Sequence, residues 1–162
     1  MTTSKPCPLY DGSRYEMNES IGHQLFSLIT MIRREVEARM AKHGLTDAQW
    51  KPLWLLKAGR ASTAIELARE MDIDAGAVTR MVDRLEAKGM IERVRSGEDR
   101  RVVNLRLTKA GEATAAEVPH VLAAVNNDFL RGFSEAEWKQ LKKLLARLAA
   151  NGTALQAESA EA

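Results

Sequence analysis

This chain of 162 residues lacks most of what membrane and secreted proteins need. Its single cysteine, Cys7, excludes an internal disulfide. No apolar run approaches the roughly 18 residues of a membrane-spanning helix, and the N-terminus lacks the basic segment and apolar core of a signal peptide. We therefore expect a cytoplasmic protein that makes no contact with a membrane.

Motifs for catalysis and metal binding are also missing from the sequence. There is no glycine-rich phosphate loop and no nucleophile motif. The histidines His23, His43 and His120 are scattered, and no two of them have the i, i+4 spacing of a helical metal site. We expect neither an enzyme, nor a metal site, nor a cofactor.

The charge of the chain is nearly balanced, at a net +2, which by itself argues only weakly for a nucleic-acid partner. Its distribution is more informative. Within residues 46–111, 13 Lys and Arg stand against 10 Asp and Glu, and the excess lies in the segment 93–106. On charge alone, an ordinary solvated surface is the alternative interpretation.

Both ends of the chain show apolar stripes with helical spacing. The first predicts a long helix over residues 18–43, with Asn18 as its N-cap. Near the other end, Thr108 is predicted to cap a helix, and a capping box at Ser134 and Glu137 begins another that ends near residue 150. The members of the first stripe are Ile21, Leu25, Leu28, Ile32, Val36 and Met40.

The terminal segments 1–17 and 151–162 show no such period. We expect the first to be a flexible arm and the second, which is rich in Ala and Glu, to be a disordered tail. The helices in 18–45 and 108–150 carry more apolar surface than a small middle segment can cover. A second copy of the chain is the simplest cover, which gives a two-fold dimer; an intramolecular bundle of the terminal helices is the alternative.

Residues 46–107 predict three short helices followed by a hairpin. The last two helices are joined by only a few residues, which is the spacing of a helix-turn-helix. The period then changes to the alternation of a half-buried strand. We therefore expect a mainly α protein with a small β-hairpin wing, in which a winged helix-turn-helix DNA-binding lobe at 46–107 is flanked by helices that form a dimerisation region. The N-caps of the three helices are predicted at Thr46, Thr63 and Asp74.

The third of these helices has the residues of a DNA-reading helix. Ala75 and Ala77 are small enough to let the backbone approach base edges and touch thymine methyl groups, and Thr79 can donate to a phosphate or a base. Arg80 and Arg84 lie on one face and can reach guanine edges or phosphates. The alternative is that both arginines pair with acidic neighbours on the surface, namely Asp83, Glu86 or Glu70.

The predicted hairpin tip adds a cationic finger. Asp99 and Arg101 are two residues apart, so the carboxylate can orient the guanidinium for a narrow minor groove. Arg100 points the other way, towards phosphate. Ser62 and Thr63, at the start of the second short helix, offer hydroxyls and free backbone N–H groups as another phosphate site.

These two segments, TRMVDRLEAKGMIER and EDRRVVNLRLTKAG, resemble the signature of the MarR family of bacterial transcription regulators, and LTDAQW resembles the family's second helix. The resemblance covers roughly residues 20–150. It implies an obligate homodimer whose two lobes read a palindromic operator in double-stranded DNA. It places the wing arginine, here Arg101, in the minor groove. It also implies base or phosphate contacts from the DNA-reading helix at Ala77, Thr79, Arg80 and Arg84.

The resemblance further implies a small phenolic or aromatic carboxylate effector, held in a cleft between the helical region and the DNA-reading lobe. Arg33 or His23 could take a carboxylate while Trp50 and Trp54 cover a ring; Arg34 is a further cation on the same helix. The tryptophans are four residues apart, which also fits a core stripe. His23 is equally explained as an exposed or satisfied histidine.

The function that we expect is therefore a dimeric, sequence-specific regulator, a repressor of a neighbouring gene or operon, which is released from DNA by an aromatic acid. One alternative is an oxidant-sensing regulator that uses Cys7. Another is a winged helix module that binds only proteins, although such a module has no use for an oriented arginine at its wing.

Overall fold

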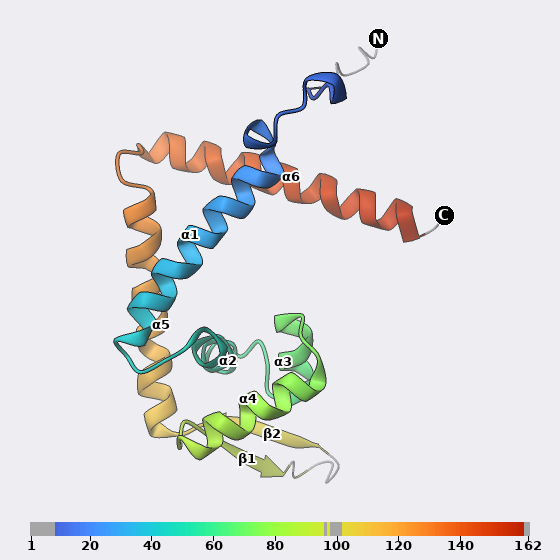
Figure 1. The fold of residues 1–162 in the computed structure, drawn as a ribbon. Coiled ribbons are helices and arrows are strands. Elements are labelled where there is room, and N and C mark those ends of the chain that lie inside the picture. Colours follow the sequence, from blue (N-terminus) through green and yellow to red (C-terminus); the bar gives the residue numbers. More distant parts are fainter. Residues whose placement is uncertain (1–8, 96, 98–101, 161–162) are drawn as a thin grey trace. The chain divides into compact units, whose positions relative to one another are not determined.

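The computed structural model describes residues 9–95, 97 and 102–160. The chain forms two compact units, residues 1–125 and 126–162, and the first contains α1 together with the segment 46–107. Helices dominate, with one antiparallel hairpin (Figure 1). The elements are η1 (Gly12–Arg14), η2 (Met17–Glu19), α1 (Ile21–Ala41), α2 (Asp47–Lys57), α3 (Ala64–Met71), α4 (Ala75–Ala87), β1 (Ile91–Arg95), β2 (Val103–Leu107), α5 (Lys109–Phe129) and α6 (Glu135–Ala160).

Local capping fixes where the short helices begin, as the sequence predicts. Before α2, the backbone N–H of Thr46 donates to Gln49 Oε1 at 3.2 Å. Before α4, Asp74 Oδ1 accepts from the backbone N–H of Ala77 at 2.8 Å. Each bond satisfies a donor that the first helical turn leaves without a partner. These predicted N-caps are confirmed.

The start of α1 differs from the prediction. Ser20, not Asn18, is the N-cap, and its Oγ accepts from the backbone N–H of His23 at 3.5 Å. Asn18 lies instead in the 3₁₀ turn η2. In the segment predicted to be a flexible arm, the Tyr10 hydroxyl accepts from the backbone N–H of Ile21 at 2.9 Å, so it satisfies a free donor at the start of α1.

The C-terminal helix is longer than predicted. Ser134 caps α6, and its Oγ accepts from the backbone N–H of Glu137 at 3.3 Å, which confirms the predicted capping box. The helix then continues to Ala160, so the prediction of a disordered tail is wrong for residues 151–160. The composition explains this, because Ala, Leu, Gln and Glu favour helix and outweigh the single Gly152.

The core of the helix-turn-helix is the inner stripe of α4. Val78, Val82 and Leu85 are fully buried, as the sequence predicts, and so are Leu67 of α3 and Leu53 of α2. Burying a side chain of this size contributes about 1.5–3 kcal/mol. The stripe therefore fixes which side of α4 faces the protein and which side faces outward.

The hairpin is attached to the helices as well as to itself. β1 and β2 pair antiparallel, with Ile91 opposite Leu107. The backbone N–H of Leu105 in β2 donates to the carbonyl of Ser62 at 2.7 Å, and the chain around Thr63 bridges to the same strand. The loop before α3 thus acts as a third, very short strand that holds the hairpin beside the helix-turn-helix.

The first turn of α5 packs directly on the end of the α4–β1 turn. The Thr108 hydroxyl donates to the Gly89 carbonyl at 2.6 Å and accepts from the backbone N–H of Gly111 at 3.1 Å. The Thr108 N–H donates to the Met90 carbonyl at 3.0 Å. A Cβ at Gly111 would overlap that same carbonyl oxygen, so only glycine permits this approach.

Substitution of Gly111 by Ala is therefore expected to destabilise the protein, by about 1–3 kcal/mol, because the methyl group can fit only if the backbone shifts. Urea unfolding measures the change. Gly152→Ala is the matched control, since a Cβ in the interior of α6 would meet no atom within 4 Å. That variant is expected to be neutral or up to about 1 kcal/mol more stable. Equal stability of the two variants would refute the close approach.

Candidate nucleic-acid interface

The outward side of α4 has two flanks of different charge. With about 100° of rotation per residue, Ala75, Thr79 and Asp83 share one flank with Glu86. Arg80 and Arg84 share the other. Ala75, Thr79, Arg80 and Arg84 are exposed, and Ala77 is half-buried. The residues that the sequence proposed for base contact are thus outward-facing or partly so, and the two arginines lie together.

The acidic neighbours proposed as alternative partners of these arginines are engaged elsewhere. Glu70 pairs with Arg60 at 2.7 Å, and Asp83 and Glu86 both pair with Arg93. Within the described part of the chain, Arg80 and Arg84 form no ion pair. Their guanidinium groups are therefore available to an anionic partner.

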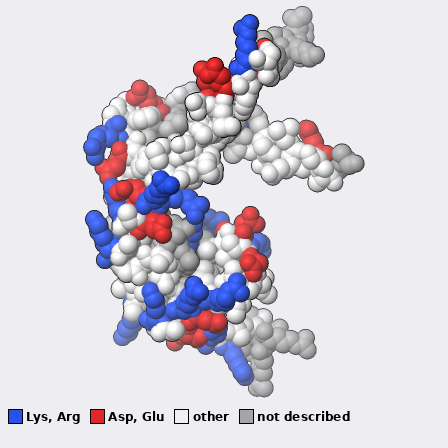
Figure 2. Space-filling view, viewed as in Figure 1, with Lys and Arg blue, Asp and Glu red and all other residues white. Residues whose placement is uncertain are grey.

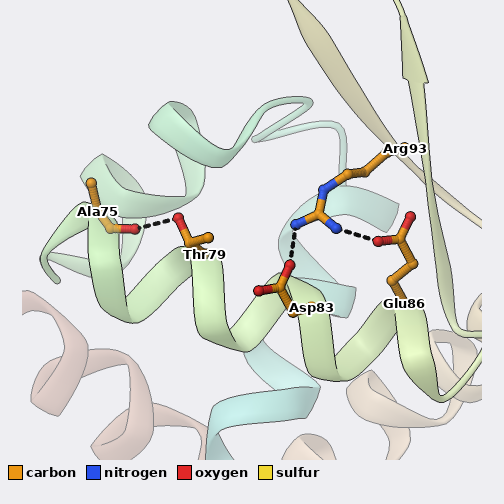
Figure 3. A network of polar contacts seen from close by, with 5 residues as sticks. All are labelled: Ala75, Thr79, Asp83, Glu86 and Arg93. Carbon is orange, nitrogen blue, oxygen red and sulfur yellow. Dashed lines mark hydrogen bonds and ion pairs between the residues drawn. The ribbon is translucent and has the colours of Figure 1, made fainter.

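Arg93 of β1 forms a clamp on the acidic flank of α4 (Figure 3). Its Nη2 lies 2.6 Å from Asp83 Oδ1, and its Nη1 contacts Glu86 Oε2. The hydrogen bond that Arg93 donates to Asp83, and after it the charge of Glu86, raise the pKa of Arg93 above its ordinary value. Sequence reasoning missed this clamp, because no local spacing links a strand residue to two positions on the preceding helix.

The Thr79 hydroxyl is also committed, because it donates to the Ala75 carbonyl at 2.9 Å (Figure 3). This is the usual back-bond of a threonine inside a helix. In this arrangement Thr79 presents lone pairs outward, so it can accept a hydrogen bond, for example from a base amino group. Donation to a phosphate, as expected from the sequence, requires the hydroxyl to rotate.

The start of α3 does not offer the free donors that the sequence predicted. Glu66 Oε2 accepts from the backbone N–H of Ser62 at 2.6 Å, from its hydroxyl at 2.8 Å, and from the Thr63 N–H at 3.1 Å. The Ser62 backbone bond is the main reason that the pKa of Glu66 lies below its ordinary value. The prediction of free N–H groups is wrong, because the capping box places a carboxylate where a phosphate would bind.

The tip of the wing, with Asp99, Arg100 and Arg101, lies outside the described residues. The strands that lead to it are described, and Arg95 and Val103 form their last pair before the tip. The role of these three side chains therefore stays a prediction.

A cleft of about 800 Å³ lies beside the basic flank of α4. Four cations, Arg33, Lys51, Arg80 and Arg84, stand around it against a single carboxylate, Glu37. The rest of the lining is apolar or uncharged: Thr46, Gln49, Met71, Ile73, Ala77 and Met81. Such a cleft suits an anion with an apolar body.

Only one of the residues proposed for effector binding lines this cleft, namely Arg33. Trp50 is buried, which supports the alternative interpretation that the tryptophans belong to the core. Trp54 is half-buried. His23 is exposed in the first turn of α1. The sequence placed the cleft along α1 and α2, and these helices do contribute Arg33 and Lys51 to its wall. The other two cations, Arg80 and Arg84, come from α4, which no sequence pattern placed opposite α1 and α2.

Charge is uneven on the surface. On the face shown in Figure 2, Lys and Arg gather over α4 and the hairpin, with acidic side chains among them. On the same face, uncharged atoms dominate α6. Among the described residues, no group of histidine, cysteine and acidic side chains could hold a metal ion, and no helix is long and apolar enough to cross a membrane.

A helix-turn-helix followed by an antiparallel hairpin defines the winged helix class of DNA-binding folds. The comparisons with known proteins give the family. The model of the MarR family matches residues 45–103. The HTH-type transcriptional repressor MdtR of Bacillus subtilis (strain 168) is 34% identical over 134 residues, which cover 83% of this chain and 86% of that protein.

Solved structures agree with this assignment. The YusO protein from Bacillus subtilis is 33% identical, covers 87% of this chain and 99% of its own, and has a TM-score of 0.65. A mutant MarR from E. coli complexed with operator DNA is 26% identical, with a TM-score of 0.69 over 79% of this chain and 92% of that chain. The chain belongs to the MarR family of transcription regulators, and the predicted fold class is confirmed.

Proposed function

We propose that this regulator is a dimeric repressor that binds a palindromic operator through α4 and the wing, and that an aromatic acid in the cleft beside α4 releases it. The observation that carries the DNA-binding part is the outward pair of Arg80 and Arg84, which have no ion-pair partner in the described chain. E. coli MarR, which shares the fold, has been crystallised with operator DNA. The relative MdtR is a repressor.

In this proposal α4 enters the major groove, and its basic flank contacts base edges or phosphates. Arginine is well suited to guanine, because its fork matches two acceptors at once. The wing carries Arg101 into the neighbouring minor groove, oriented by Asp99. Ala75 and Ala77 contribute close approach, and Arg100 a phosphate contact.

Arg80→Ala is expected to relax sequence preference by about 1–3 kcal/mol at the base pair that Arg80 reads, with a smaller effect on non-specific binding. The measurement is fluorescence anisotropy on a duplex selected by the wild-type protein and on a scrambled duplex, each over a salt series. Arg131→Ala in the second unit is the control, since it removes an arginine that is 83% exposed and far along the sequence from α4. Equal losses on both duplexes would contradict base reading by Arg80.

The proposed dimer rests on apolar surface that the single chain leaves exposed. On α1, Ile21, Phe26 and Ile29 are 47%, 68% and 50% exposed. On α6, an apolar stripe is more than a third exposed along one side of the helix. Contiguous apolar surface of this extent marks an interaction site. The α6 stripe consists of Trp138, Leu141, Leu144, Leu145, Leu148 and Leu155.

Leu145→Glu is expected to convert the dimer to a monomer at micromolar concentration, because it places a charge in the centre of the stripe that a second copy would bury. Sedimentation velocity measures the change. Arg147→Glu is the control, since it lies roughly 200° around the same helix and should leave the dimer intact. A wild-type chain that sediments as a monomer would contradict the proposed assembly.

The effector part of the proposal rests on the composition of the cleft. Its four cations face a space whose remaining walls include Met71, Ile73 and Met81. An aromatic carboxylate can bind both kinds of lining residue: its carboxylate accepts charge-assisted hydrogen bonds from the cations, and its ring packs on the apolar side chains. Arg80 and Arg84 belong to both the cleft and the proposed DNA surface. An acid held there withdraws these arginines from the duplex, and by linkage DNA weakens the acid by the same factor.

Arg33→Ala is expected to weaken binding of an aromatic acid, because Arg33 is a cation of the cleft wall outside the proposed DNA surface. Thermal shift with benzoate measures this, since a ligand at roughly ten times its Kd adds about 1.4 kcal/mol to stability. The neighbouring Arg34→Ala is the control, because Arg34 does not line the cleft. A wild-type protein whose melting point and operator affinity are unmoved by benzoate and phenols would contradict the proposed effector class.

A further inference from the structure

The flank of α4 that faces the hairpin has the wrong charge for a DNA-binding helix. Asp83 and Glu86 are one turn apart and both point to that flank (Figure 3). Neither is deeply buried, with side chains 57% and 39% exposed. Two carboxylates on a helix that enters the major groove would repel the phosphates on either side, and at low ionic strength such repulsion reaches about 10 Å or more.

Arg93, which lies on β1 and not on α4, offsets the charge of these two carboxylates. In β1 it is two residues from the buried Ile91 and opposite Leu105, so its side chain lies on the side of the hairpin that faces the helices. From there one guanidinium donates to both carboxylates, to Asp83 at 2.6 Å and to Glu86. Only a planar fork gives two separated acids a nitrogen each.

We propose that Arg93 enables α4 to bind DNA by neutralising Asp83 and Glu86, so that it determines DNA affinity through these two residues without itself contacting the duplex. This inference rests on the proposed function. It differs from a purely structural role, in which the clamp would matter only for stability. An ion pair as exposed as this one contributes little to stability, typically about 0–1 kcal/mol.

The test compares the wild type, Arg93→Met, and Arg93→Met combined with Asp83→Asn and Glu86→Gln, on a duplex that the wild type has selected from a random pool. Anisotropy titrations over a potassium chloride series give affinity and its salt dependence. Arg106→Met is the matched control, because it removes one exposed arginine from the other strand of the same hairpin, and Arg106 forms no ion pair within the described residues. Melting curves and sedimentation report fold and assembly.

We expect Arg93→Met to bind about tenfold more weakly or worse at low salt, with the loss shrinking as salt screens the exposed carboxylates. The triple variant should recover to within about threefold of the wild type, because it has no acids left to mask. Arg106→Met should lose less than Arg93→Met. Arg93→Lys, which keeps one positive charge near the acids but loses the fork, should bind more tightly than Arg93→Met and more weakly than the wild type. It provides the comparison if the methionine variant does not fold, and a lysine variant that binds no better than an unfolded or unmasked control would count against the inference.

Two results would overturn the inference: Arg93→Met binding as well as Arg106→Met, or a triple variant that stays as weak as Arg93→Met. A folded wild type that selects no duplex and shows no salt-dependent DNA binding would instead overturn the proposed function, and the inference with it. The wild-type titration therefore separates the two failures.

Discussion

Burial of the inner stripe of α4 is the constraint on which the candidate interface depends. Val78, Val82 and Leu85 are fully buried, so the helix has one permitted rotation about its axis. That rotation sends Arg80 and Arg84 to the cleft side and the acidic residues to the hairpin side. A different rotation would bury charge without a partner, which costs several kcal/mol. The position of the proposed DNA surface is therefore a consequence of hydrophobic packing.

The hairpin owes its place to contacts at its base and along β1. At its base, Thr108 ties the first turn of α5 to the end of the α4–β1 turn, and Gly111 lets the backbones meet. Along its length, Arg93 ties β1 to α4. The first turn of α5 and the start of β1 are thus joined by direct hydrogen bonds as well as through the chain from β2.

Local rules in the sequence were enough to predict the caps at Thr46, Thr63 and Asp74, the inner stripe of α4 and the hairpin, since each depends on residues a few positions apart. The predictions failed where side chains that are far apart in the sequence come together in the structure. Asp83 and Glu86 share a partner, Arg93, that lies on a strand. The cleft is lined by Gln49 and Lys51 of α2 together with α1 and α4, and not by the tryptophans of α2. Burial of Trp50 follows from packing among helices, which a single stripe does not specify. α6 extends about ten residues beyond its predicted end, because the segment after residue 150 lacks an apolar period but is rich in residues that favour helix.

The contacts made by acidic side chains explain how a chain with a net charge of only +2 can still present arginines on α4. Five acidic side chains on or beside α3 and α4 have partners within the protein. Glu66 and Asp74 receive backbone N–H groups at helix starts, while Glu70 holds Arg60 and the pair on α4 holds Arg93. These five acids are thus matched locally, and among the described ion pairs none involves Arg80 or Arg84 on the outward side of α4. If α4 enters the major groove as proposed, attraction to phosphates then comes from few unmatched cations, and the choice of sequence depends on the geometry of Arg80 and Arg84, because phosphate contacts position a protein while base contacts specify the sequence.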